Sequence, residues 1–217
     1  MAGQRVANTP AISIIGIAYR APGPGRPECG ERHEFDHDWF GIDAHEANRM
    51  DLAQYRALEV AIEAVDDAGI GYLLRGSDTA ILLAVCAGTA AFTRSTHRLA
   101  AVLDLHGPRL VLDHADPASG AAIELATNML TEASVPFVIV IEVGRSASAL
   151  AGVRADTEPS DSITALVLQR TADASGARTL SHADIIGTAS ASDRERLEPE
   201  DIGVAGLDVG TDQALVR

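Results

Sequence analysis

The residues best suited to chemistry lie in one short run, Asp113, His114 and Asp116, directly after the apolar segment 109–112. A histidine has an unperturbed pKa of about 6.5, so beside a carboxylate it can act as a general acid or base near neutral pH. Alternate side chains of a strand face opposite ways, so His114 and Asp116 share a face only if the strand continues past Asp113. A purely structural histidine is the competing interpretation of His114.

Asp116 also has a structural interpretation. Pro117 follows it at the start of a predicted helix over 116–132, where the missing proline N–H costs nothing. The free amides and the dipole at a helix N-terminus favour a carboxylate as the capping group. The sequence therefore predicts a helix cap at Asp116, a catalytic carboxylate, or both.

Cys86 is the remaining side chain with intrinsic reactivity. It follows the apolar run 79–85, where a buried cysteine usually behaves as a small hydrophobic residue, and a catalytic thiol is the alternative. Cys29 lies far away in a segment rich in glycine and proline, so the two cysteines form no disulfide framework. This cysteine usage favours a reducing cytoplasm.

Histidines and acids also cluster near the N-terminus, at His33, His37, His45, Glu34, Asp36 and Asp38. Their spacing matches no standard zinc pattern, so we expect solvated loop residues and no metal. The Gly-rich stretches PGPG and VGT do not join a strand to a helix as a dinucleotide-binding loop does. The sequence therefore predicts no cofactor.

The elements that position these residues follow a layered α/β order. The apolar runs and turn residues predict the following elements: a strand over 11–18, a helix over 43–68 closed by Gly69, strands over 79–85 and 109–112, a helix over 116–132, strands over 137–143 and 163–169, a turn at 173–176 and a partner strand over 178–188. The strands are apolar and branched, which is typical of strands buried in a core.

Composition limits the possible partners. The 217 residues include 31 acidic and 17 basic side chains, for a formal charge of −14. Such a chain repels polyanions over a Debye length of roughly 8 Å, so we expect neither nucleic acid nor an anionic membrane as a partner. The apolar run 11–18 is too short to span a bilayer and lacks a basic leader. A single domain with a solvated acidic surface is the simplest prediction.

The segment from Phe35 to Gly69 resembles the N-terminal part of β-ketoacyl synthase domains from modular polyketide synthases. The following residues fall on that pattern: Phe35, Asp36, Phe40, Gly41, Ile42, Glu46, Met50, Asp51, Gln54, Leu58, Glu59, Glu63 and Gly69. The similarity continues in IIGIAYRAPG, LRGSDTAILLAV, LDLHGPRLVLD and ALVLQRTADA. It implies half of a thiolase-like fold, with a five-stranded mixed sheet layered with helices.

The resemblance implies one truncated ketosynthase-like domain over residues 1–217. Within it we expect a strand and a shortened loop over 10–34, the best family match over 35–170 and a degenerate end over 171–217. In the family, the strand that matches 109–115 pairs with its copy across a two-fold axis. A homodimer through Arg109 to Ala115 is therefore expected.

Three departures from the family pattern concern catalysis. Asp116 stands where the family has its nucleophilic cysteine, and a carboxylate is a much weaker acyl acceptor than a thiolate. Leu207 occupies the position of the first catalytic histidine and cannot transfer a proton. The sequence ends at Arg217, before the family's second histidine and its lysine. The resemblance thus implies that Claisen condensation is lost.

Three functional hypotheses follow. The first is an accessory protein of polyketide biosynthesis that binds a synthase, an acyl carrier protein or an acyl intermediate. The second is a repurposed enzyme in which Asp116, with His114 and Asp113, acts as acid and base in cyclisation, dehydration or hydrolysis of a polyketide intermediate. The third is a decayed remnant that still folds, because the hydrophobic pattern of its strands is intact.

Overall fold

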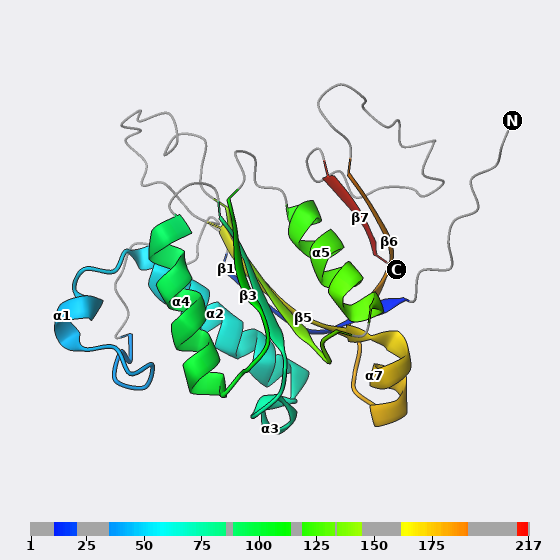
Figure 1. Ribbon diagram of the computed structural model, residues 1–217, viewed down its shortest axis with the longest axis horizontal. Helices are drawn as coiled ribbons and strands as arrows, with labels where there is room; N and C mark the ends of the chain where they lie inside the picture. The colour runs from blue at the N-terminus through cyan, green and yellow to red at the C-terminus, as the bar shows by residue number, and fades with distance from the viewer. Residues whose placement is uncertain are drawn as a thin grey trace, which may run out of the picture.

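The computed structural model describes residues 11–20, 35–85, 89–113, 119–132, 134–144, 162–190 and 212–216. Its centre is a seven-stranded mixed sheet with the strand order β3-β2-β4-β5-β1-β6-β7 (Figure 1). The strands are β1 (Ile12–Arg20), β2 (Ala80–Val85), β3 (Arg109–Asp113), β4 (Val138–Gly144), β5 (Ser162–Arg170), β6 (Ala183–Ser190) and β7 (Asp212–Val216). The predicted α/β class with a mixed sheet is confirmed, with seven strands in place of five.

Helices cover both faces of the sheet. They are α1 (Ala44–Ala47), α2 (Leu52–Ala68), α3 (Gly71–Leu74), α4 (Thr89–Leu103), α5 (Ser119–Thr131) and α7 (Thr171–Ala177). Helices α2 and α4 pack on one face, while α5 packs on the other (Figure 1). Within the described part of the chain, no helix has the length and apolar character needed to cross a membrane.

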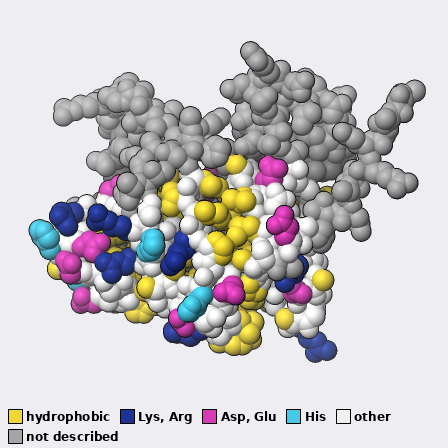
Figure 2. Space-filling model, in the orientation of Figure 1, with side chains coloured by type: hydrophobic (Ala, Val, Ile, Leu, Met, Phe, Trp, Pro, Cys, Tyr) yellow, Lys and Arg dark blue, Asp and Glu magenta, His cyan; other side chains and the backbone are white. Residues whose placement is uncertain are grey.

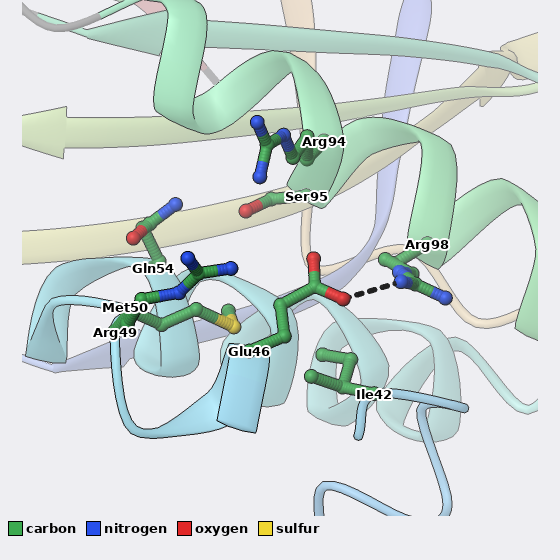
Figure 3. Close-up of a pocket in the computed structure, with 8 residues that line it drawn as sticks. All are labelled: Ile42, Glu46, Arg49, Met50, Gln54, Arg94, Ser95 and Arg98. Atoms are coloured by element: carbon green, nitrogen blue, oxygen red, sulfur yellow. Dashed lines mark hydrogen bonds and ion pairs between the residues drawn. The ribbon is translucent and has the colours of Figure 1, made fainter. Parts of the chain in front are cut away.

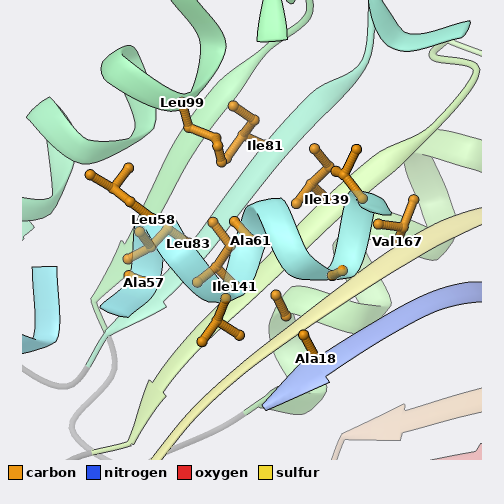
Figure 4. Packing of buried hydrophobic residues seen from close by; sticks show 14 of the residues in the cluster. Ala18, Ala57, Leu58, Ala61, Ile81, Leu83, Leu99, Ile139, Ile141 and Val167 are labelled. Carbon is orange, nitrogen blue, oxygen red and sulfur yellow. The ribbon is translucent and has the colours of Figure 1, made fainter. Parts of the chain in front are cut away.

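Strand β2 shows why the sheet lies at the centre of the core. It pairs in parallel with β3 and β4, and all six of its residues are buried. Ile81 and Leu83 join the core cluster shared with α2 and α4 (Figure 4), whereas Leu82 joins the cluster under α5. A strand buried on both faces requires a continuous apolar run, and this is the pattern that AILLAV provides.

The helix predicted over 43–68 is two helices. Residues 48–51 interrupt it, and α2 begins after Asp51, whose carboxylate accepts a hydrogen bond from the Gln54 amide. The Gln54 side chain accepts one in return from the Asp51 amide, which completes a capping box. The prediction was right for 52–68, including the end at Gly69, which has a left-handed backbone with φ of 65°.

Helix α4 was not predicted. Its sequence, TAAFTRSTHRLAAVL, contains three threonines, a serine and three cationic or imidazole side chains, which mask the helical pattern. In the structure, Phe92, Ser95, Thr96, Leu99 and Ala100 are buried at helical spacing, so packing on the sheet outweighs their individual propensities.

The C-terminal strands pair differently from the prediction. The expected turn at 173–176 is part of the helix α7, and the strand expected over 178–188 is β6. This strand does not pair with β5, because β1 lies between them and is antiparallel to both. A helix of seven residues lets the chain cross over β1, which a tight hairpin turn would not allow.

Candidate functional site

The predicted site lies at the carboxyl edge of the parallel strands. Val85 of β2 is in register with Asp113 of β3 and with Val143 of β4, so the three strands end together. The chain runs from β3 through residues 114–118 to the start of α5 at Ser119. In α/β sheets, ligands bind characteristically beyond the carboxyl ends of the strands. The carboxyl ends of these strands are therefore a typical position for a binding site.

The predicted catalytic residues are only partly located by the structure. The backbone of Asp113 ends β3, as the sequence indicated. His114 and Asp116 lie outside the described residues, as do Cys86 and Leu207. The strand before the site and the helix after it are confirmed, whereas the acid–base and capping roles of Asp116 remain predictions.

The histidine cluster near the N-terminus is partly described. The Nδ1 atom of His37 lies 2.8 Å from the carbonyl oxygen of Ile42 and 3.2 Å from the Asp38 carboxylate. His45 is exposed in α1, and His33 lies outside the described residues. In the described ranges, no three side chains of His, Cys, Asp or Glu are grouped so that they could hold a metal ion.

A pocket that was not predicted lies between the start of α2 and the helix α4. It has a volume of about 250 Å³ and is lined by Ile42, Glu46, Arg49, Met50, Gln54, Arg94, Ser95 and Arg98 (Figure 3). The sequence does place Arg94 and Arg98 one helical turn apart in an acidic chain. This spacing puts the two arginines on one face only if residues 89–103 form a helix, which the sequence did not predict.

Arg98 and Glu46 form one wall of this pocket. Arg98 donates one hydrogen bond of 2.7 Å to the Glu46 carboxylate and another of 2.8 Å to the carbonyl oxygen of Gly41. Both side chains are partly buried. A guanidinium that binds a carboxylate and a carbonyl together fixes the geometry of both. Arg98 therefore holds the segment around α1 against α4.

We expect Arg98→Met to lower the free energy of unfolding by about 1.5–3 kcal/mol, because it leaves a partly buried carboxylate without its partner. Urea unfolding of the purified protein measures this loss. Arg20→Met is the matched control, since Arg20 forms a more exposed ion pair with Glu63 and such pairs contribute about 0–1 kcal/mol. Equal losses in the two variants would contradict the assigned role of Arg98.

Asp67 forms a second polar contact that joins distant elements. Its carboxylate accepts a 2.9 Å hydrogen bond from the Ile17 amide of β1 and lies 2.6 Å from Nε2 of His182, just before β6. The Ile17 amide, partly opposed by burial and assisted by His182, lowers the pKa of Asp67 below its ordinary value of 3.8. The ionised form is therefore favoured in the folded protein.

This lowered pKa predicts a pH dependence. The contribution of Asp67 to stability is fully present above pH 3.8 and is lost as pH falls through its pKa in the folded protein. We expect a small effect, below about 1 kcal/mol, because solvent screens a carboxylate that is 40% exposed. Asp67→Asn should reduce the loss of stability between about pH 6 and pH 2.5 in urea unfolding. The exposed neighbour Asp66→Asn is the control, and equal curves for both variants would refute the prediction.

Comparison with known proteins identifies a family and individual proteins to which this chain is similar. Residues 26–98 match the family described as β-ketoacyl synthase, N-terminal domain. The chain is 30% identical over 129 residues to hispidin synthase of Neonothopanus nambi, which covers 49% of this chain and 8% of that protein. It is 51% identical over 53 residues to 6-methylsalicylic acid synthase of Penicillium patulum, covering 24% of this chain and 3% of that protein.

Solved ketosynthase structures have the same fold. The oxazolomycin ketosynthase domain OzmH KS8 from Streptomyces albus JA3453 aligns with a TM-score of 0.68 and 20% identity, over 93% of this chain and 56% of that one. The ketosynthase from module 6 of the bacillaene synthase of Bacillus subtilis 168 aligns with a TM-score of 0.63 and 20% identity, over 82% of this chain and 43% of that one.

The sheet and its helices define a protein of the thiolase-like fold, as found in ketosynthases. The chain is related to the β-ketoacyl synthase domains of polyketide synthases, and the resemblance found in the sequence is confirmed. The chain spans less than a tenth of the length of the curated relatives cited above.

Proposed function

We propose that this protein is a ketosynthase-like accessory protein of polyketide biosynthesis. It binds a synthase, an acyl carrier protein or an acyl intermediate and does not carry out Claisen condensation. The observation that supports the proposal is that the structure contains β3 and α5, and that Asp116 lies between them in the sequence, at the position that the sequence resemblance assigns to the family's nucleophilic cysteine. The fold that presents the acyl site is thus combined with a residue unsuited to acyl transfer.

We further propose that the protein acts as a homodimer through Arg109 to Ala115. In the described sheet, β3 is the end strand and pairs only with β2. Leu110 of β3 is 40% exposed, and Figure 2 shows hydrophobic side chains gathered between β3 and α5. An unpaired edge strand beside apolar surface favours pairing with a second copy, since this satisfies its free N–H and C=O groups.

The test uses purified protein incubated with an acyl carrier protein loaded with acetyl, malonyl or acetoacetyl groups. We expect a stable complex, detected by native mass spectrometry, and no condensation product. The complex should persist in Asp116→Asn, which removes the carboxylate charge and keeps the side-chain shape. Condensation by the wild-type protein would overturn the proposal.

The second candidate function is acid–base catalysis by Asp116 with His114. It is favoured by one observation, the position of residues 114–118 directly after the carboxyl end of a parallel strand. General acid–base groups typically contribute about 10²–10⁴-fold to rate. Turnover of a loaded intermediate that is lost in Asp116→Asn or His114→Ala would establish this function in place of the accessory role. A folded protein with neither complex nor turnover would support a remnant.

A further inference from the structure

We propose that the pocket between α2 and α4 is an anion-binding site for a small organic phosphate or carboxylate. Arg49, Arg94 and the hydroxyl of Ser95 would hold its oxygen atoms. The site involves none of the residues predicted for catalysis, so this inference goes beyond the proposed function and does not depend on it.

Charge is the first argument. The whole chain carries a formal charge of −14, yet the pocket is lined by three arginines and one glutamate. Glu46 is already paired with Arg98. Among the described residues, neither Arg49 nor Arg94 forms a direct ion pair, although Arg49 interacts with the Asp43 carboxylate at longer range. Both guanidinium groups therefore keep their donors for a ligand. In Figure 2, several basic side chains lie over α1 and towards α4, together with acidic side chains and histidines.

Ser95 is the second and independent argument. Its side chain is only 3% exposed, and its Oγ has no hydrogen-bond partner among the described residues. The neighbouring Thr96 donates its hydroxyl to the carbonyl oxygen of Thr93 at 2.9 Å, which is the usual solution for a hydroxyl in a helix. The Ser95 hydroxyl points from α4 towards Gln54 and Arg49, into the pocket (Figure 3).

A bound oxyanion would satisfy this hydroxyl. Buried donors without a partner are costly, so native structures rarely keep them without a reason. An anion oxygen can accept the Ser95 proton while the guanidinium groups of Arg49 and Arg94 donate to the other oxygens. Arginine suits this role because its planar fork of donors matches the geometry of carboxylates and phosphates.

The size and walls of the pocket define the class of ligand. Its volume of about 250 Å³ lies just below the range of about 300–1,000 Å³ for typical ligand pockets. Ile42 and Met50 add apolar surface beside the arginines. The pocket thus fits a short organic anion or the charged end of a longer one, and it is too small for a polyanion.

The experiment measures binding of two probes, inorganic phosphate and malonate, by isothermal titration calorimetry at constant ionic strength. Sodium chloride serves as the reference salt. We expect the wild-type protein to bind at least one probe, and Arg49→Gln and Arg94→Gln each to weaken that binding at least tenfold. Arg75→Gln is the matched control, because Arg75 is exposed and lies outside the pocket, and it should bind as the wild type does.

Ser95→Ala provides a second test, which distinguishes a serine that binds an anion from one with a structural role only. It should weaken anion binding while leaving the thermal stability of the free protein unchanged or raised, since it removes an unsatisfied buried hydroxyl. If a Gln variant fails to fold, Arg94→Lys and Arg49→Lys keep the charge and should weaken binding less severely.

The outcomes are distinct. Binding of phosphate alone assigns the site to phosphate ligands, and binding of malonate alone assigns it to carboxylates. Either of these results, or binding of both probes, supports the proposal. It is overturned if neither probe binds more tightly than chloride, or if both arginine variants bind as the wild type does. A failed carrier-protein complex would leave these results unaffected, so the two proposals can fail separately.

Discussion

Gly16→Ala is expected to destabilise the protein by about 2–3 kcal/mol or more, which is the upper range for overpacking a core. A Cβ atom added at Gly16 would lie 2.2 Å from the carbonyl oxygen of Ala64 and 2.8 Å from the Cβ of Ala68. Both contacts belong to α2, and the first is with backbone that cannot rotate away. Strand β1 and helix α2 would have to separate.

The position of Gly16 explains why this separation is costly. The pairing of β1 with β5 shifts register between Ile14 and Gly16, so the backbone is already irregular there. Helix α2 is fixed at its start by the capping box of Asp51, and the alanines on its inner face bring it close to the sheet. Small residues on both sides allow the close approach, and adding one methyl group removes that complementarity.

Urea unfolding measures the effect, and Gly176→Ala provides the matched control. Gly176 lies in the short helix α7, and a Cβ atom there would meet nothing within 4 Å. Alanine is favoured over glycine within a helix by about 0.5–1 kcal/mol, so this variant should be as stable as the wild type or more so. Equal losses in the two variants would show that crowding at Gly16 is not the cause.

The success of the sequence predictions depended on how local the signal was. The strands β2 and β4 were found because β2 is a continuous apolar run and β4 is apolar over its first four residues, as strands buried on both faces require. The pairing of β6 was predicted wrongly, because its neighbour β1 lies at the other end of the sequence. Pairing over such a distance leaves no local pattern, and a turn between two strand-like runs favours a hairpin by default.

The candidate sites, too, could be predicted only where the sequence pattern is local. Asp116 was singled out from its residue type and its place after an apolar strand, and the strand and helix around it were predicted correctly. The arginine pocket was missed because Glu46 and Arg98 are 52 residues apart and meet only through the tertiary structure. The role of Ser95 was not predicted either, because a serine within a polar segment is expected to be exposed, whereas Ser95 is buried in the structure.

The end strand β3 leads to the second large effect. Leu110→Arg is expected to weaken self-association at least tenfold, which corresponds to about 1.4 kcal/mol at 25 °C. In a two-fold dimer each substitution occurs twice, so two new positive charges would enter the same interface. Leu110 is partly exposed beside the sheet edge, and its apolar side chain would be buried only when a second copy pairs with β3.

Sedimentation equilibrium over a range of protein concentrations measures this change. Leu180→Arg is the matched control, because Leu180 is 86% exposed in the loop before β6, a strand that is far from β3 in the strand order. The control should associate as the wild type does. A wild-type protein that stays monomeric, or a Leu110→Arg variant that dimerises unchanged, would show that this edge is not the interface. A carrier-protein complex formed by such a monomer would then leave β3 as a docking edge for the carrier protein itself, since an unpaired strand can add a strand of a partner.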